Sequence, residues 1–288
     1  MKIKDLFNDY LKYCEIYRKK GTYIYYKKTF KQLLNIFDEL QITNTDDFTN
    51  KTRDDIVITL RNKYRKKNSK INDTLSALYS ALNKAKIKTD IGEQIKLNDD
   101  SESFKVLSDE ELNKLLRYVK SLDLTNSNNK SWALAVYLLL DTGVRLNELL
   151  NIKIKNIDLV TQSIKLDITK NGKKRIVFYG QLSKALIEEV MKNNKNEFLL
   201  FNYITNKKLD FRSIYYFFDK VQRKLKLERK IHPHRLRKTF ATKLLLKGCP
   251  ITTIQKLLGH QSLAQTMIYL EVSNFVLEKD YKEFYMNY

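Results

Sequence analysis

Cysteine, proline and glycine are scarce in this chain of 288 residues, which has two cysteines, two prolines and seven glycines. Two cysteines cannot build the disulfide framework of a small secreted protein, so they indicate a reducing compartment. The sequence has no run of about 18 apolar residues, the length that spans a membrane. Residues 1–15 carry acidic groups and an amphipathic pattern instead of an apolar signal region. We therefore expect a cytoplasmic protein.

Several motifs of nucleotide and metal binding are also missing. The sequence has no GxxxxGKS/T phosphate loop, no GxGxxG fingerprint, no paired CxxC and no internal repeat. His232, His234, Cys249 and His260 offer an HxH pattern and one cysteine, which is not a standard zinc-ligand spacing. We expect neither a metal site nor a cofactor.

The strongest compositional signal is charge. Lysine and arginine outnumber aspartate and glutamate by 54 to 33, which gives a net charge of +21. A charge of this size favours a polyanionic partner, and nucleic acid is the first candidate. The alternative is a nucleotide-biased genome that enriches lysine, asparagine and isoleucine. A membrane surface fits less well, because no single helix sets basic residues opposite a bulky apolar face.

The length predicts two domains, and helical periodicity in the first 88 residues predicts a small bundle. Four helices are expected, at 3–19, 22–40, 56–66 and 69–85. Gly21 can end the first helix and Thr22 can cap the second. Thr52 with Asp55 resembles a capping box for the third. The basic strip at 61–70 suits contact with a DNA backbone, and it equally suits a solvated helix face.

Residues 89–103 are polar, acidic and without periodicity, so we place an interdomain linker there. Beyond it, Ser108 and Glu111 form a capping box that opens a helix at 109–120. A buried helix is expected at 131–141, after a loop.

The periodicity changes in the middle of the second domain. Alternating apolar residues predict three strands, at 155–159, 163–168 and 175–179. Amphipathic helices follow at 182–193 and 211–225, and we interpret the aromatic run YYFF of the latter as core. The expected fold class is mainly α: a helical bundle, then a mostly helical domain with a small three-stranded antiparallel sheet.

A hairpin turn is predicted inside this sheet at Asn171-Gly172. Lys170 stands directly before the turn, where its amine can reach outward or simply be solvated. Its neighbours Lys173, Lys174 and Arg175 suit contacts with a DNA backbone.

The stretch TGVRLNEL at 142–149 combines a break with a new helical start. Gly143 permits the sharp turn, and Arg145 is then presented near the start of the next helix. Glu148, three residues on, lies on the same flank and can hold the guanidinium. The alternative is an ordinary ion pair on the surface.

All three histidines and both prolines lie between residues 232 and 269. In a helix that begins near Pro233, His234 and Arg237 are one turn apart and point to the same side. The start of a helix also offers backbone N–H groups that favour anions. Together these features make half of a phosphate-binding site.

The same stretch continues with two more breaks. Gly248 ends one helix and Pro250 begins the next, which Gly259 stops so that His260 projects from the turn. His260 can equally be a hydrogen-bonded core histidine. Tyr269, one of 18 tyrosines, follows on a short segment that Ser262 can cap.

Six of these positions, in this order and at roughly these spacings, resemble the tyrosine recombinase (phage integrase) family. The matching motifs are TGVRLNEL, the lysine before the turn in TKNGKKR, HPHRLRKTFAT and LLGHQSLAQTMIY. They carry the candidate catalytic residues Arg145, Lys170, His234, Arg237, His260 and Tyr269. The resemblance covers residues 104–288, while residues 1–88 resemble the family's core-binding domain only in size, position and helicity.

The resemblance implies how these residues act on DNA. Attack on a phosphodiester concentrates negative charge on the non-bridging oxygens, and the planar forks of Arg145 and Arg237 suit a bidentate grip on them. Such a site needs neither a metal nor ATP. Tyr269 would be the nucleophile that forms a covalent 3′-phosphotyrosine.

The other three positions would handle protons and orientation. Lys170 would be the general acid that protonates the departing 5′ oxygen, and His234 would assist proton transfer near the nucleophile. His260 would donate a hydrogen bond to the phosphate. The family further implies a homo-tetramer on two double-stranded DNA recombination sites, with strand exchange through a Holliday junction.

Two other classes of protein stay open. A nicking and resealing enzyme of the type IB topoisomerase kind would use related chemistry, and a catalytically silent DNA-binding protein would bind the same site. Among recombinases, the sequence leans towards a Xer-like system for resolution, or towards integration and excision of a mobile element. The last 19 residues, 270–288, are aromatic-rich and suit docking on a neighbouring protomer or packing in cis.

Overall fold

The computed structural model describes residues 1–98, 106–167, 174–193, 196–205, 207–227 and 230–270. The chain divides into two compact units, Met1–Glu102 and Ser103–Tyr288. Within the described ranges, no helix is long and apolar enough to cross a bilayer.

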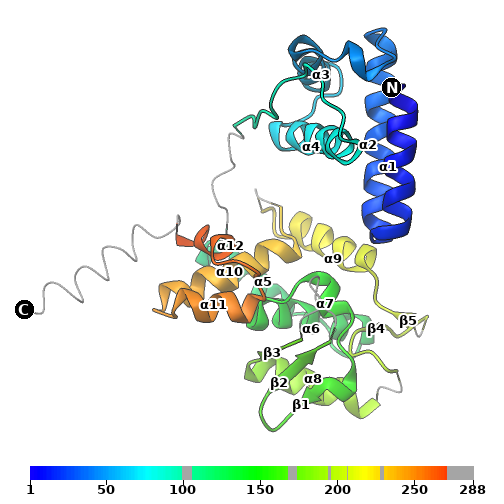
Figure 1. Cartoon of the computed structure of the whole chain (residues 1–288). Helices are drawn as coiled ribbons and strands as arrows, with labels where there is room; N and C mark the ends of the chain where they lie inside the picture. Colours follow the sequence, from blue (N-terminus) through cyan, green and yellow to red (C-terminus); the bar gives the residue numbers. More distant parts are fainter. Residues whose placement is uncertain (99–105, 168–173, 194–195, 206, 228–229, 271–288) are drawn as a thin grey trace, which may run out of the picture. The chain divides into compact units, whose positions relative to one another are not determined.

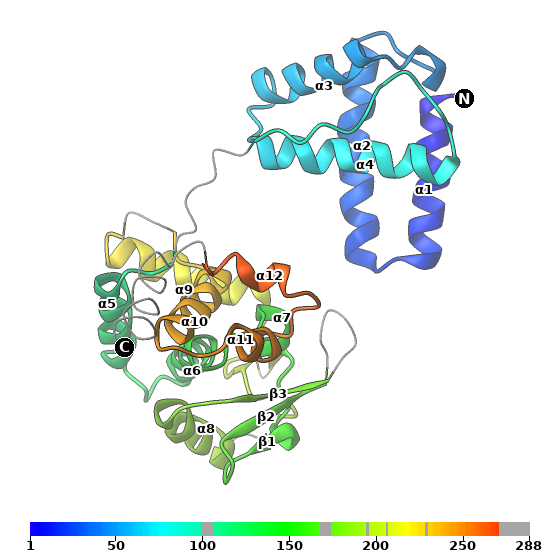
Figure 2. The same ribbon diagram turned by 60° about the vertical axis from the view of Figure 1, so that its left-hand side comes forward.

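The first unit is a bundle built on a helical hairpin. Helices α1 and α2 lie side by side, and α4 lies across them (Figures 1 and 2). The helices are α1 (Ile3–Tyr17), α2 (Lys20–Glu39), α3 (Asn50–Asn62) and α4 (Asn68–Ala85), with a short 3-10 turn at Thr45–Asp47. All four were expected from the apolar periodicity.

Aromatic and aliphatic side chains at helical spacing fill the core of this bundle. The rings of Phe7 on α1 and Phe30 on α2 stack with their centroids 4.1 Å apart, and Phe37 stacks on Phe48 at 5.0 Å. Cys14 is fully buried in the same cluster. This packing of apolar stripes, rather than helix propensity, holds the hairpin closed.

The starts of two helices differ from the prediction. Gly21 lies inside the first turn of α2, whose N-cap is the extended residue Lys19, so Thr22 is no cap. Helix α3 begins before Thr52, because Thr49 is its N-cap and the Thr49 hydroxyl accepts from the Thr52 backbone N–H at 3.3 Å. Several polar residues precede each of these two helices and could act as its N-cap. Tertiary packing, not the local sequence, decides which of them does.

Residues 89–98, the first part of the predicted linker, pack against this bundle. The Tyr79 hydroxyl donates to the carbonyls of Gly92 and Glu93, each at 3.2 Å. The Asn72 side chain bonds the backbone of Leu97 through both its donor and its acceptor, each at 2.9 Å. Ile91 is buried. The linker and domain boundaries at 88 and 103 remain predictions.

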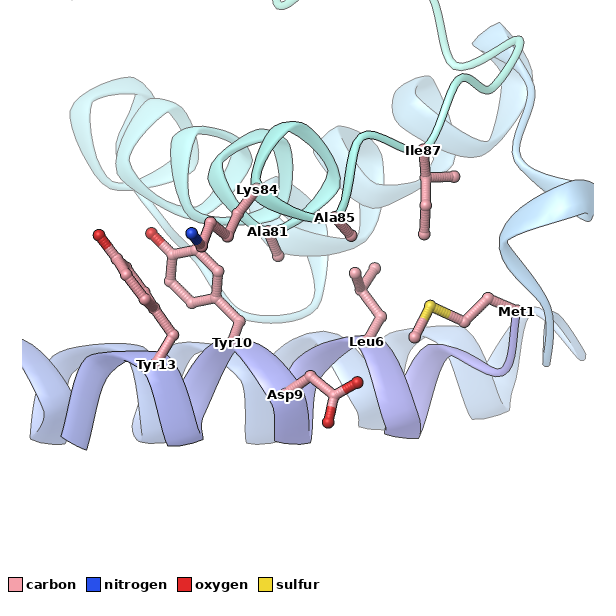
Figure 3. A pocket seen from close by; sticks show the side chains of 9 residues that line it. All are labelled: Met1, Leu6, Asp9, Tyr10, Tyr13, Ala81, Lys84, Ala85 and Ile87. Atoms are coloured by element: carbon pink, nitrogen blue, oxygen red, sulfur yellow. The ribbon is translucent and has the colours of Figure 1, made fainter. Parts of the chain in front are cut away.

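A pocket opens between α1 and the end of α4 (Figure 3). The Lys84 ammonium lies 4.4 Å from the centroid of the Tyr13 ring at one side of the pocket. Its lining is Met1, Leu6, Asp9, Tyr10, Tyr13, Ala81, Lys84, Ala85 and Ile87. None of the six candidate catalytic residues lies there, so this pocket is separate from the chemistry that the motifs predict.

The second unit contains eight helices and two small sheets in its described residues. The helices are α5 (Asp109–Lys120), α6 (Ser127–Thr142), α7 (Leu146–Leu150), α8 (Gln181–Asn193), α9 (Phe211–Lys224), α10 (Pro233–Leu246), α11 (Ile251–Leu258) and α12 (Ala264–Met267). The strands are β1 (Ile157–Asp158), β2 (Ser163–Leu166), β3 (Arg175–Phe178), β4 (Phe201–Asn202) and β5 (Lys207–Lys208), and a 3-10 turn spans Ile154–Asn156.

Helix α6 is the centre of this unit. It contacts α5, α7, α8 and α10 as well as strands β3 and β4, and its residues from Ala133 to Leu139 are all buried. A helix that is apolar on all sides is buried on all sides. It begins at Ser127, four residues before the predicted start, because the Asn126 side chain caps it.

The three-stranded antiparallel sheet confirms the expected fold class. Its order is β1-β2-β3, with Ile164 opposite both Ile157 and Val177, and α11 lies beside β3 (Figure 2). The hairpin turn Asn171-Gly172 and Lys170 lie outside the described residues. The two-stranded sheet of β4 and β5 was not predicted, since strands of two residues leave no readable alternation.

Two smaller features of this unit were only partly foreseen. On α9, Phe217 and Phe218 are buried as predicted, whereas Tyr215 and Tyr216 are exposed, because a helix turns neighbouring residues towards different sides. Helix α12 has Leu263 as its N-cap, so the predicted cap at Ser262 is wrong by one residue.

Candidate active site

The turn after α6 brings the first arginine of the candidate site into place. Gly143 ends α6 in the left-handed region at φ +59°. A side chain at this position would put its Cβ 2.3 Å from Cδ1 of Phe240. Glycine is therefore required both by the backbone and by the neighbouring ring. The turn leaves Arg145 as the N-cap of α7.

Glu148 on α7 is a buried anchor for two arginines. Its Oε2 accepts from the Arg145 backbone N–H at 2.8 Å, and its Oε1 accepts from the Arg145 Nη1 at 3.1 Å. Arg175 on β3 donates through Nη1 to Oε1 at 2.8 Å and through Nη2 to Oε2 at 2.7 Å. The Glu148 side chain is only 2% exposed, so this is not the surface ion pair that the sequence left open.

The two arginines stabilise the ionised form of Glu148. Burial acts to raise the pKa of the carboxyl, but the hydrogen bonds and charges of Arg175 and Arg145 outweigh it and lower the pKa. The carboxylate is therefore ionised at neutral pH. The prediction that Arg175 contacts a DNA backbone is wrong, because its guanidinium is turned inward onto this carboxylate.

The second arginine comes from α10. Pro233 occupies the first turn of that helix, where a missing N–H costs nothing. Arg237, one turn on, is 1% exposed and donates from Nη1 to the Gly143 carbonyl at 2.6 Å and from Nη2 to the Leu258 carbonyl at 2.7 Å. Burial and the nearby charge of Arg145 lower its pKa to about 9, so it stays charged at neutral pH.

Both guanidinium groups meet at the end of α11. Gly259 stops this helix at φ +64° and turns its carbonyl towards Arg145, whose Nη2 donates to it at 3.2 Å. The Leu258 carbonyl accepts from Arg237 at 2.7 Å and from the Arg145 Nη1 at 3.5 Å. The turn at residues 258–259 thus fixes the two forks next to each other.

His260 follows this turn and lies parallel to Tyr269. The two rings have centroids 6.2 Å apart and planes 8° from parallel. The Nδ1 atom of His260 shares a hydrogen bond of 2.9 Å with the Thr266 hydroxyl. Burial, then the charges of Arg237 and Arg145, lower the pKa of His260 to about 4, so the ring is neutral at pH 7.

His234 lies at the start of α10, in the same positive field. Desolvation and the charges of Arg237 and Lys238 lower its pKa to about 4. His234 is itself exposed to solvent. Like His260, this ring is neutral at pH 7.

Tyr269 is 1% exposed and packs with residues of α10 and α11, among them Leu245, Ile254 and Leu258. Burial raises the pKa of its phenol, while the charges of Arg237 and Arg145 act to lower it. The tyrosine therefore lies within the field of both arginines, in the same chain as they do.

The structure thus brings together five of the six candidate residues, from the start of α7, from α10 and from the turns after α11 and α12. Lys170 lies outside the described residues. Thr266 is a neighbour of the site that the sequence did not single out, and Arg175 is one that the sequence assigned to the DNA backbone instead. In strand β3, Ile176 and Phe178 are exposed while Val177 is buried, so the alternation that turns Val177 inward also turns Arg175 inward.

Residues 105–274, more than half of the chain, match the phage integrase family. The chain belongs to the phage integrase family. It is a tyrosine recombinase of Xer-like type, as its motifs indicated. In the described part of the chain, no group of three or more histidine, cysteine, aspartate or glutamate side chains could hold a metal ion.

Several curated relatives of this recombinase are named as integrases or tyrosine recombinases. A probable integrase/recombinase of Acholeplasma phage L2 is 29% identical over 226 residues, which cover 78% of each chain. Tyrosine recombinase XerA of Saccharolobus solfataricus is 38% identical over 148 residues, 51% of this chain and 48% of that protein. XerC of Staphylococcus carnosus is 36% identical over 150 residues, 50% of each. The match spans about half the length of these two Xer relatives.

Solved structures share the fold of this recombinase. The Tn1549 transposon integrase in complex with transposon right end DNA superposes with a TM-score of 0.81 at 18% identity, over 99% of each chain. XerA recombinase superposes with a TM-score of 0.54 at 22% identity, over 98% of this chain and 97% of that one. At these identities the likeness shows the fold alone.

Proposed function

We propose that this recombinase cuts and rejoins DNA at a specific site by attack of Tyr269 on a phosphodiester. One observation carries the proposal. The forks of Arg145 and Arg237 converge on the turn at residues 258–259, beside the parallel rings of His260 and Tyr269. A pair of cationic forks next to a phenol is the arrangement that phosphoryl transfer to a tyrosine requires.

The arginines supply the binding of the phosphate. Each guanidinium has five N–H donors, and the carbonyls of Gly143, Leu258 and Gly259 orient the two forks while leaving donors for the non-bridging oxygens. A phosphate also compensates the buried charge of Arg237, whose pKa is lowered because it lies away from water and close to Arg145. The two arginines therefore favour an anion before any chemistry occurs.

Different residues around Tyr269 are proposed to carry out the separate proton transfers of the reaction. The raised pKa of Tyr269 keeps the phenol protonated at rest, so attack requires a proton acceptor. His234 is our candidate for that role, because its ring is neutral at pH 7 and has a nitrogen lone pair that can accept the proton. If the Thr266 hydroxyl donates to Nδ1 of His260, then Nε2 of that ring carries the proton and donates to the phosphate. Lys170 is our candidate for protonating the 5′ oxygen that leaves.

The partners follow from the same chemistry. A 3′-phosphotyrosine keeps the energy of the broken phosphodiester, so rejoining to another strand needs no ATP and no metal. We propose double-stranded recombination sites as the substrate, a homo-tetramer that exchanges strands through a Holliday junction, and action in the cytoplasm, where Cys14 and Cys249 stay unpaired. Two biological roles fit: Xer-like resolution, and integration or excision of a mobile element.

The test begins with the DNA site itself. DNA that is covalently trapped on the protein is sequenced, and a nicked, labelled version of that site is incubated with the protein and run on a denaturing gel. Wild type should give a covalent band that disappears in Tyr269→Phe. Tyr216→Phe, at a tyrosine that is 60% exposed, is the matched control and should keep the band.

The remaining outcomes separate the alternatives. No band from wild type on a verified site would support a silent DNA-binding protein. A band with relaxation of supercoils but no recombinant product would support an enzyme of the type IB topoisomerase kind. Recombinant product from two sites supports the proposal.

A further inference from the structure

We propose that Arg175 is a positioning residue for strand cleavage. This proposal depends on the function proposed above. It does not touch the DNA. Its guanidinium instead locks Glu148 and the turn before His260, and through them fixes the fork of Arg145 at the reacting phosphate.

The contacts of Arg175 join three separate elements. From the start of β3 it makes a bidentate pair with Glu148 on α7, with N–O distances of 2.8 Å and 2.7 Å. Its Nε donates to the Leu257 carbonyl near the end of α11 at 3.0 Å. The side chain is only 10% exposed. Three of its N–H groups are thus directed at the protein interior.

Gly259 shows how tightly this guanidinium fits against the turn. A Cβ built on Gly259 would lie 2.9 Å from Nη1 of Arg175 and 3.1 Å from its Cδ and Cζ atoms. The left-handed backbone at φ +64° also favours glycine there. Only a residue without a side chain leaves room for Arg175, and this same residue offers the carbonyl that orients Arg145.

The energetic link runs through the shared carboxylate. Glu148 is buried, so its charge needs partners, and Arg175 supplies two of the hydrogen bonds that it accepts. Without Arg175, the free carboxylate oxygens would turn to Arg145. Arg145 would then lose its bond to the Gly259 carbonyl, and its fork would turn away from that of Arg237. A small displacement of a catalytic fork costs a large factor in rate.

The main test separates positioning from stability. Arg175→Gln, the double variant Glu148→Gln/Arg175→Gln and wild type are compared in single-turnover cleavage of the nicked site at saturating protein, in DNA affinity and in thermal unfolding. The single variant should lose Tm and about 10²–10³-fold in cleavage, as for loss of one oriented donor, while DNA affinity changes little. Arg212→Gln, at an exposed arginine of α9, is the matched control and should cleave like wild type.

The double variant decides the matter. It removes the unpaired buried charge, and glutamine at position 148 can still accept from the Arg145 backbone N–H, so Tm should recover. Cleavage should stay low, because the fork is still not held. Cleavage that recovers together with Tm would overturn the proposal, since Arg175 would then act only on the fold.

A second substrate tests which step is affected. With a 5′-bridging phosphorothiolate the leaving sulfur needs no proton, so this substrate should rescue a general-acid variant such as Lys170→Ala. Arg175→Gln should not be rescued, because its defect lies in the grip on the phosphate. Rescue of Arg175→Gln would overturn the proposal. If wild type forms no adduct with its verified site, the proposed function fails before Arg175 is tested.

Discussion

Replacement of Arg237 by lysine tests the central arginine most sharply, because it keeps an amine that can carry the charge and removes the fork. Arg237 reaches two carbonyls on different elements, Gly143 after α6 and Leu258 at the end of α11, at 2.6 Å and 2.7 Å. Lysine has a single nitrogen and can reach only one of them. If the lysine bonds the Leu258 carbonyl, which Arg145 also reaches, the Gly143 carbonyl is left buried without this donor, at a cost of about 1–3 kcal/mol. For a unit of this size each kcal/mol lowers Tm by roughly 2–4 °C.

The effect of Arg237→Lys on cleavage also depends on pH. The site lowers the pKa of Arg237 from 12.5 to about 9. The same burial and the same charge of Arg145 would lower the pKa of a lysine at this position, so the variant would lose part of its charge as the pH rises. We expect cleavage about 10²–10³-fold below wild type at neutral pH.

The assay is single-turnover cleavage of the nicked site by variant and wild type between pH 6 and pH 8. The ratio of variant to wild type cancels the titration of every other group. It should rise as the pH falls from 8 to 6, because the protonated fraction of a lysine with a lowered pKa rises in that direction. Arg212→Lys, at an exposed arginine, is the control and should show a ratio near one. A constant ratio for Arg237→Lys across this range would refute the reasoning.

Three further predictions concern the surroundings of the site. Gly143→Ala should lower the free energy of unfolding by about 1–2 kcal/mol because of the left-handed backbone, and by more because the new Cβ clashes with Phe240. Gly248→Ala, whose Cβ has nothing within 4 Å, should lose only the backbone contribution. Equal losses of Tm in the two variants would contradict the clash. Thr266→Val removes the partner of His260 and should slow cleavage roughly 2–10-fold, the value of one hydrogen bond, with little change in Tm; unchanged cleavage would show that this bond does not orient the ring. In the folded chain the pKa values of His234 and His260 are about 4, so both rings stay neutral as the pH falls towards that value. In the unfolded chain the same rings bind protons below about pH 6.5. The free energy of unfolding should therefore fall as the pH drops from 6.5 towards 4.5. Urea unfolding at these pH values should show a smaller loss for His260→Gln, and a flat profile for wild type would count against buried neutral histidines.

The sequence predicts this fold best at positions where only one local structure suits the residue, such as helix caps and glycine turns. Ser108 and Glu111 bond each other's backbone as expected, and α5 begins and ends at the predicted residues. Gly143 and Gly259 both have positive φ where breaks were expected. Long apolar stripes fixed the existence of the other helices, because only burial satisfies them.

Other features depend on contacts between distant segments. No local pattern shows that Arg175 turns onto Glu148, since its neighbours on the hairpin are lysines and a DNA-facing reading fits them as well. The choice between Thr49 and Thr52 as the cap of α3 is likewise made by packing. The motifs were sufficient to identify the candidate residues. The hydrogen bonds to backbone carbonyls that align Arg145 and Arg237 could not be predicted, because they form only where the turns after α6 and α11 lie together.

The most direct measurement is to map the tyrosine that becomes linked to DNA. The covalent complex with the nicked site is digested with protease and nuclease, and the peptide that carries the 3′-phosphate is identified by mass spectrometry. Among 18 tyrosines, we expect the modification on Tyr269. A phosphate on any other tyrosine, or an adduct that persists in Tyr269→Phe, would contradict it.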